Sequence, residues 1–203
     1  MSNLLVLKSS STGPTSVTNT LVNTFVARHR EREPQVVVVE RNLDRQPLPH
    51  LTIMNVDGVR SHAVTDIEVE TSAVSSELIA ELQAADTLVI GAPMHNFSVP
   101  TTLRAWFDHV LRPGVTFGYS EAGPKGLVTG KRAILILSRG GPYAEGVTDH
   151  QESYLRELLA FIGITDVEVV RAGKTAFGPE ARDASITEAS TQIAGLVGQR
   201  LAA

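Results

Sequence analysis

The stretch Thr87-Leu-Val-Ile-Gly-Ala-Pro-Met-His-Asn-Phe97 decides the fold of this chain. Its first part is a continuous apolar run, which is typical of a strand buried on both faces of a parallel sheet. Gly91 and Pro93 follow, and the strand is expected to stop there, since proline has no N–H to give to a neighbouring strand. Beyond it come a thioether, an imidazole, a carboxamide and a phenyl ring. In an open α/β sheet, ligands bind at the carboxyl end of such a strand.

Four further apolar runs predict strands at residues 3–8, 35–40, 131–138 and 166–170. Apolar positions at helical spacing predict helices over 21–32, 74–82, 103–111, 154–162 and 186–201, the first capped by Thr15 or Ser16. This alternation predicts a doubly wound α/β fold of three layers, in which five parallel strands lie in the order 2-1-3-4-5. All 203 residues are expected to form a single domain.

Two segments interrupt the alternation of strands and helices. Residues 112–130 contain five glycines around two short apolar runs, so we expect a hairpin-like insertion. Residues 41–72 contain two prolines and no clear period. They are expected to form a long connection, with short helical turns, over one face of the site.

Composition excludes several classes of protein. Apolar residues make up 42% of the chain and charged residues 20%, as in ordinary globular proteins rather than disordered ones. The net charge of −4 gives no basic face, so no nucleic-acid partner is expected. No cysteine is present, which removes disulfides and thiolate catalysis, and the histidines show no zinc-binding spacing. The apolar run at 4–7 is too short for a signal peptide or a membrane span, so we expect a cytoplasmic protein.

The loop after the first strand is rich in hydroxyl groups. Residues 9–20 carry eight hydroxyl side chains in twelve positions, directly before a helix. The N–H groups and positive dipole end of a helix N-terminus suit a phosphate, and Ser10, Ser16 and Thr18 would add neutral donors. The loop holds no lysine, so it is not a Walker loop. The alternative interpretation is an ordinary polar loop before a capped helix.

Two more loops follow strands. Met94 to Phe97 offers side chains that suit a flat ligand with apolar faces. Each residue alone is explained by a core position, a surface position or a turn, but their position together at the end of a strand favours a site. In the segment 138–141, Gly140 and Gly141 let backbone N–H groups approach a ligand, and Arg139 adds positive charge. The order 2-1-3-4-5 brings all three loops to one crevice. Without a GxGxxG fingerprint, this favours a mononucleotide, and we interpret the 94–97 loop as one wall of a flavin site.

The combination resembles the FMN-dependent NADH-azoreductase family, also described as NADH:quinone oxidoreductases of flavodoxin-like fold. The similar segments lie at 3–10, 92–97, 114–119, 126–131, 138–141 and 161–166, and thus span most of the chain. Val17, His95 and the pair Pro142-Tyr143 depart from the family pattern, and residues 50–72 match it poorly. Val17 stands where a polar side chain is common, so only its backbone N–H is available to a phosphate, and His95 replaces a frequent tyrosine.

The resemblance implies tightly bound, non-covalent FMN in a homodimer with two sites at the interface. Its implied FMN contacts are Ser10, Ser16, Val17, Thr18, Met94, His95, Asn96, Phe97, Ser138, Arg139, Gly140 and Gly141. Tyr119 and Phe161 would line the substrate pocket. Backbone N–H groups of 138–141, or Arg139, would stabilise the negative charge of the reduced flavin.

The resemblance also implies the reaction. NADH is the co-substrate, flavin N5 rather than a side chain carries the hydride, and the oxidised substrate then takes the place of NADH in a ping-pong cycle. Quinones would take two electrons per cycle, azo compounds would need two cycles to give amines, and nitroaromatics are further candidates. Two other functions stay open: a flavodoxin-like electron-transfer module, and an FMN reductase that releases reduced flavin.

Overall fold

A five-stranded parallel sheet runs through the protein, whose computed structural model describes residues 2–121, 123–142 and 149–197. Its strands are β1 (Asn3–Lys8), β2 (Val37–Asn42), β3 (Thr87–Pro93), β6 (Arg132–Ser138) and β7 (Asp166–Ala172). They lie in the order β2-β1-β3-β6-β7, and every neighbouring pair is parallel. When these strands are numbered by themselves, the order is the predicted 2-1-3-4-5, because β4 and β5 form a separate sheet.

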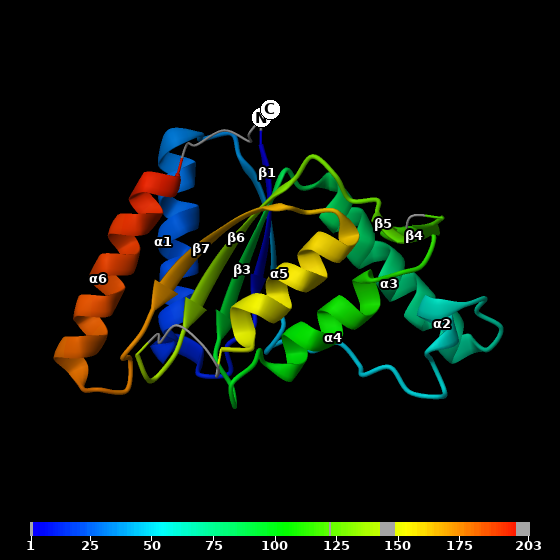
Figure 1. The fold of residues 1–203 in the computed structure, drawn as a ribbon, viewed down its shortest axis with the longest axis horizontal. Helices are drawn as coiled ribbons and strands as arrows, with labels where there is room; N and C mark the ends of the chain where they lie inside the picture. Colours follow the sequence, from blue (N-terminus) through cyan, green and yellow to red (C-terminus); the bar gives the residue numbers. More distant parts are fainter. Residues whose placement is uncertain (1, 122, 143–148, 198–203) are drawn as a thin grey trace.

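Helices cover both faces of the sheet (Figure 1). One face carries α1 (Val17–Arg32) and α6 (Pro179–Leu196), and the other carries α3 (Asp66–Ala84), α4 (Thr101–Val110) and α5 (Gln151–Ile162). Each face buries its own apolar cluster, since successive strand residues point to opposite sides of a sheet. The three-layer arrangement follows from this division.

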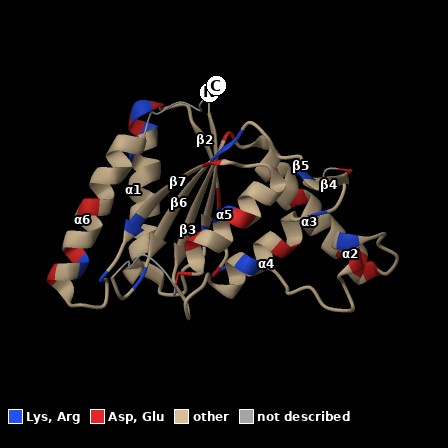
Figure 2. Cartoon of the chain, viewed as in Figure 1, with Lys and Arg blue, Asp and Glu red and all other residues tan. Residues whose placement is uncertain are grey.

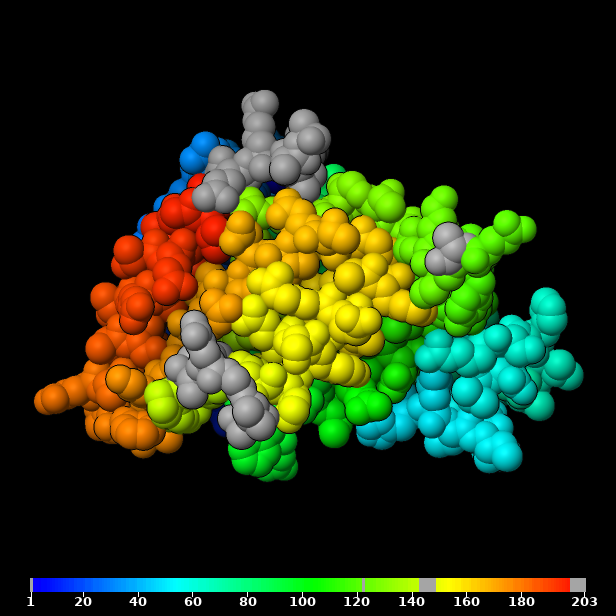
Figure 3. Space-filling view, in the orientation of Figure 1, coloured from blue at the N-terminus to red at the C-terminus, as the bar shows by residue number. Residues whose placement is uncertain are grey.

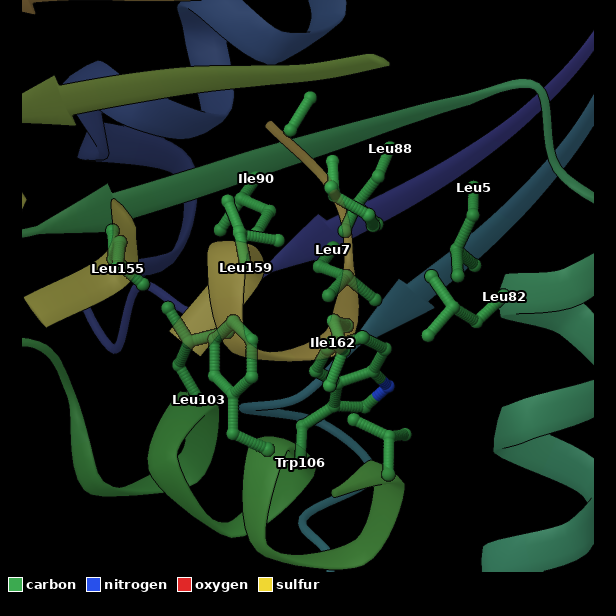
Figure 4. Packing of buried hydrophobic residues seen from close by; sticks show 14 of the residues in the cluster. Leu5, Leu7, Leu82, Leu88, Ile90, Leu103, Trp106, Leu155, Leu159 and Ile162 are labelled. Atoms are coloured by element: carbon green, nitrogen blue, oxygen red, sulfur yellow. The ribbon is translucent and has the colours of Figure 1, made fainter. Parts of the chain in front are cut away.

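The larger cluster lies between the sheet and α3, α4 and α5. Figure 4 shows Leu7 of β1 and Ile90 of β3 facing side chains of α4 and α5. Trp106 of α4 is fully buried there, and its ring meets Phe107 edge-on with centroids 5.0 Å apart. Such large buried rings contribute heavily to the stability of a core.

Strand β3 continues through Gly91 and ends at Pro93, so only the proline ends it. Glycine is required at position 91 for another reason. A Cβ placed there would lie 2.7 Å from Cγ2 of Val22, which belongs to α1. The glycine therefore lets α1 approach the middle of the sheet closely.

The predicted connection 41–72 is shorter than expected, because α3 already begins at Asp66. The Thr65 hydroxyl accepts a hydrogen bond from the Glu68 backbone, and the Glu68 carboxylate accepts one from the Thr65 N–H at 2.8 Å. The backbone N–H groups of Thr65 and Val64, which both donate to this carboxylate, hold the pKa of Glu68 below its usual value. The Thr-x-x-Glu pattern at 65–68 is a helix-start signal that places this boundary from sequence. Within the connection, α2 (Asp57–Arg60) is one of the expected short helical turns.

The glycine-rich insertion forms an antiparallel hairpin of β4 (Phe117–Ser120) and β5 (Gly123–Gly126), as predicted. It packs against the end of α5: a Cβ at Gly126 would lie 2.2 Å from the backbone nitrogen of Gly163. Since α5 ends just before β7 begins, the hairpin lies toward the edge of the sheet where the strands start (Figure 1).

The surface mixes both signs of charge. Figure 2 shows Lys and Arg as well as Asp and Glu on helices of both faces of the sheet. In Figure 3, α5 covers the middle of one face, between α6 and the segment that contains α2. No described helix is long and apolar enough to cross a membrane. The last predicted helix is α6, and its expected position Leu201 lies outside the described residues.

Candidate functional site

A cavity of about 240 Å³ opens where β1, β3 and β6 end. Its lining residues are Ser10, Thr12, Thr15, Ser16, Val17, Pro93, Ser138, Arg139, Gly140, Thr175 and Arg182. The structure thus brings the predicted loops after β1 and β6 to one cavity, and the end of β3 reaches it through Pro93.

The start of α1 forms one wall of the cavity. The Ser16 hydroxyl accepts a hydrogen bond from the Asn19 N–H at 3.1 Å, so Ser16, rather than Thr15, is the N-cap among the two candidates from the sequence. The Ser10 hydroxyl lies 3.0 Å from that of Thr12. The first N–H groups of a helix have no partner within the helix, and those of α1 begin beside these hydroxyls. The wall therefore offers donors to an anion.

Thr18 has a different place from the one expected. Its side chain is 0% exposed, and its hydroxyl lies 3.1 Å from the Ser16 hydroxyl. The Thr18 side chain therefore supports Ser16 from behind rather than lining the cavity. Its backbone N–H lies in the first turn of α1, where helix N–H groups have no partner within the helix.

The loop after β6 forms the opposite wall. The Ser138 carbonyl accepts a hydrogen bond from Met94 N–H at 2.7 Å, which ties this loop to the one after β3. Gly140 packs against the segment after β7, since a Cβ there would lie 3.2 Å from Cβ of Ala176. Gly141 accepts the N–H of Lys174 at 2.8 Å, which ties it to the same segment.

The positive charge of Arg139 is less available to a ligand than the sequence indicated, because it is paired within the protein. Its guanidinium is buried and lies 2.5 Å from the carboxylate of Asp149, and its backbone N–H donates to Ala172. A buried cation needs such a partner. The expectation of a fixed positive charge at this loop is thus corrected: the Arg139 charge is balanced by Asp149.

Residues 95–98 make a tight turn just after β3, whose last residue Pro93 lines the cavity. The backbone of His95 exchanges hydrogen bonds of 2.9 and 3.0 Å with Ser98. Between them, Asn96 has φ 47° and Phe97 has φ 70°. Of the described residues in 93–97, only Pro93 lines the cavity itself, and the Phe97 side chain is 61% exposed beyond it. A phenylalanine with positive φ is uncommon, and such strain gathers at ligand sites.

Sequence reasoning missed two of the cavity residues completely. Thr175 follows β7, and its hydroxyl donates to the Arg139 carbonyl at 2.9 Å. Arg182 belongs to α6, and its Nη2 donates to the Thr15 carbonyl at 2.6 Å. Neither residue stands in a local motif, so no signal in the sequence points to them. Thr12 and Thr15 lay within the hydroxyl-rich loop already singled out.

The chemistry of the lining favours an anion. Among the described residues that line the cavity none is acidic, whereas hydroxyls, a helix N-terminus and two guanidinium groups are present. Among the described residues there is also no group of three or more His, Asp or Glu side chains that could hold a metal ion. The cavity therefore suits a phosphate-sized anion rather than a cation.

Tyr119 and Phe161 do not lie at this cavity. Phe161 is near the end of α5, whereas Gln151 at the start of α5 donates to the Ala92 carbonyl beside the site. A helix of 12 residues is about 18 Å long, which separates the two. The Phe161 ring lies 4.6 Å from Phe117 of the hairpin, and Tyr119 is 77% exposed.

The chain is similar to several known proteins. A family model described as a flavodoxin-like fold matches residues 2–196. A protein of Hyphomonas neptunium named FMN-dependent NADH:quinone oxidoreductase is 54% identical over 197 residues, 96% of this chain and 95% of that protein. One of Pseudomonas fluorescens, named FMN-dependent NADH:quinone oxidoreductase 2, is 42% identical over 196 residues, 96% and 98% of the two chains. An azoreductase structure from Bacillus anthracis superposes with a TM-score of 0.87 and 27% sequence identity. The match covers 97% of this chain and 99% of that one.

The strain at Phe97 gives a testable prediction. Left-handed backbone costs about 1–2 kcal/mol for a residue with a Cβ, and glycine removes that cost while adding roughly 0.5–1 kcal/mol of lost chain entropy. We expect Phe97→Gly to raise the free energy of unfolding by up to about 1 kcal/mol in urea titrations. Phe97→Ala keeps the Cβ and serves as the control, which should not gain stability. A loss of stability in the glycine variant would mean that the ring holds the turn.

Proposed function

The chain belongs to the flavodoxin-like fold family, and from this membership and its relatives we infer that it is an FMN-dependent NADH:quinone oxidoreductase. We further propose that it cleaves the azo bonds of aromatic azo compounds to amines, by analogy with the azoreductase that shares its fold. The observation that carries the proposal is the cavity at the ends of β1, β3 and β6, whose described lining offers hydroxyls, a helix N-terminus and guanidinium groups but no acidic side chain.

The cavity fits one end of FMN. Pockets for whole ligands of this kind usually measure about 300–1,000 Å³, so a cavity of about 240 Å³ takes only part of the molecule. We propose that the phosphate lies against Ser10, Ser16 and the N–H groups of Val17 and Thr18. The flat ring would then lie outside the cavity, over the turn 94–97 and the loop 138–141, where the exposed Phe97 side chain is available.

When bound, FMN supplies the redox chemistry: it accepts a hydride from NADH and passes two electrons to the oxidised substrate. The chain supplies position and polarity. Met94 and Phe97 offer apolar surface for the ring, and Gly140 and Gly141 allow backbone N–H groups to approach its polar edge. Because the Arg139 charge is balanced by Asp149, we assign the stabilisation of negative charge to these N–H groups. No side chain is assigned a catalytic step.

We propose a ping-pong mechanism in a homodimer. Tyr119 and Phe161 lie about the length of α5 from the cavity of their own chain, so they would line a substrate pocket only from a second copy. Tyr119 is exposed, so its ring is available for such a contact. Quinones, azo dyes and nitroaromatics are flat and would suit a pocket with aromatic walls.

We also propose that the 203 residues act as one domain in the cytoplasm. Both apolar clusters pack on the same sheet, which supports a single folding unit. An NADH-dependent reductase would meet its co-substrate in the cytoplasm.

The function is tested by the absorption spectrum of the purified protein, followed by anaerobic addition of NADH. We expect a yellow protein whose flavin bleaches promptly with NADH and recovers on addition of a quinone. Slow bleaching would favour an electron-transfer module instead. Loss of FMN on gel filtration after turnover would favour a reductase that releases reduced flavin. A colourless protein that takes up no added FMN would contradict the proposal.

Ser16→Asp should weaken FMN binding. Two like charges about 5 Å apart repel by roughly 3 kcal/mol at a protein surface, which corresponds to about a hundredfold in the dissociation constant. Aspartate is itself a good N-cap, so α1 should stay intact and the unfolding free energy should change little. Ser16→Asn is the matched control, which keeps the cap without the charge. Equal FMN affinity for both variants would move the phosphate elsewhere.

Phe161→Ala should raise KM for bulky quinones while leaving FMN content unchanged, because the ring lies far from the cavity of its own chain. Co-expression with Ser16→Asp chains tests the arrangement across the dimer. In a mixed dimer, one of the two sites would combine an intact cavity with an intact Phe161 from the other chain. We expect the wild-type KM to return at that site. Mixed dimers without this recovery would show that each site uses a single chain.

A further inference from the structure

Arg182 reaches the cavity from a distant part of the chain. It lies in the first turns of α6, and α6 packs beside α1 so that both helices start at the same edge of the sheet (Figure 1). Its Nη2 donates to the carbonyl of Thr15, in the turn that precedes α1. The side chain lines the same cavity as Ser10 and Ser16.

The charges around the cavity single out Arg182. Two guanidinium groups line it, and that of Arg139 is paired with Asp149 at 2.5 Å. For Arg182, no carboxylate lies within ion-pair distance anywhere in the part of the chain that the structure describes. Within the described residues, its positive charge is therefore the one left unbalanced at this cavity.

The guanidinium also has donors to spare. Arginine carries five N–H donors in a rigid fork, and the Thr15 carbonyl takes only one of them. Arginine binds phosphate through two parallel hydrogen bonds, which are stronger than bonds between neutral groups. The bond to Thr15 holds the side chain at the cavity, so little freedom would be lost when a phosphate binds.

We propose that Arg182 is a phosphate-binding residue of the cofactor site and sets the preference for FMN over riboflavin, which lacks the phosphate. The inference rests on the proposed function, since it takes FMN as the ligand of the cavity. It makes the start of α6, more than 160 residues after the hydroxyl-rich loop, part of the same phosphate site.

A purely structural role for Arg182 makes a different prediction. If the side chain only tied α6 to Thr15, its loss would weaken the binding of FMN and of riboflavin equally. If it were an ordinary surface arginine, its loss would affect neither. Only a direct contact with the phosphate weakens FMN binding and spares riboflavin.

The test compares dissociation constants for FMN and riboflavin on the full-length chain freed of flavin, measured by quenching of flavin fluorescence. We expect Arg182→Gln to weaken FMN binding about tenfold or more, as the loss of a charged hydrogen bond does, and to change riboflavin binding less than about twofold. Arg182→Lys keeps the charge but not the fork and should lie between. Arg30→Gln removes an equal charge from the far end of α1 and should match the wild type.

The outcomes separate this inference from the proposed function. A wild-type chain that binds neither flavin would refute the proposed function. A wild-type chain that prefers FMN, with the preference unchanged in Arg182→Gln, would refute this inference alone. Equal loss of both flavins would assign Arg182 to the structural role. If circular dichroism shows that Arg182→Gln folds poorly, the rate of FMN release from Arg182→Lys holoprotein is compared with that of the wild type instead. A faster release is expected. Equal release rates would overturn the inference.

Discussion

Parallel pairing of β3 with β1 and with β6 is the constraint on which the site depends. In this register Lys8 lies opposite Gly91, and Pro93 lies opposite Ser138, so the three strands end almost level. The loops that follow are then bonded to their neighbours. Ser9 donates to the Gly91 carbonyl from both its backbone and its hydroxyl, and Met94 donates to Ser138. The donors of the cavity are thus held in place by the ends of the sheet.

Packing on both faces keeps this register fixed. Each strand of the middle of the sheet is apolar on both sides, and a shift of one residue would exchange the two clusters. Gly91 adds a further requirement, since it lets α1 lie close against β3. The same approach carries the N-terminus of α1 to the cavity. Core packing and ligand binding are therefore linked through the position of one helix.

The site combines a rigid base with an exposed rim. The base is a small polar cavity made of hydroxyl groups, the N-terminus of α1 and two arginines, of which Arg139 is held by Asp149. The rim is the turn that contains Asn96 and Phe97, which both have positive φ, and the Phe97 ring is exposed. A phosphate suits the first and a flat ring suits the second. The proposed substrate pocket would then need the aromatic residues at the far end of α5, supplied by a second copy.

Apolar runs and helix signals are local, and they were sufficient for the five strands and the hairpin, because burial and backbone hydrogen bonding over a few residues produce them. They narrowed the cap of α1 to Thr15 or Ser16, and the structure shows that it is Ser16. The Thr-x-x-Glu signal at 65–68 would have placed the start of α3 in the same way. Pairings between distant residues were not accessible to such reasoning. Asp149 balances Arg139, and Arg182 reaches Thr15, only because α5, α6 and α1 pack where they do. Those contacts depend on how helices dock across the sheet, which no short stretch of sequence encodes.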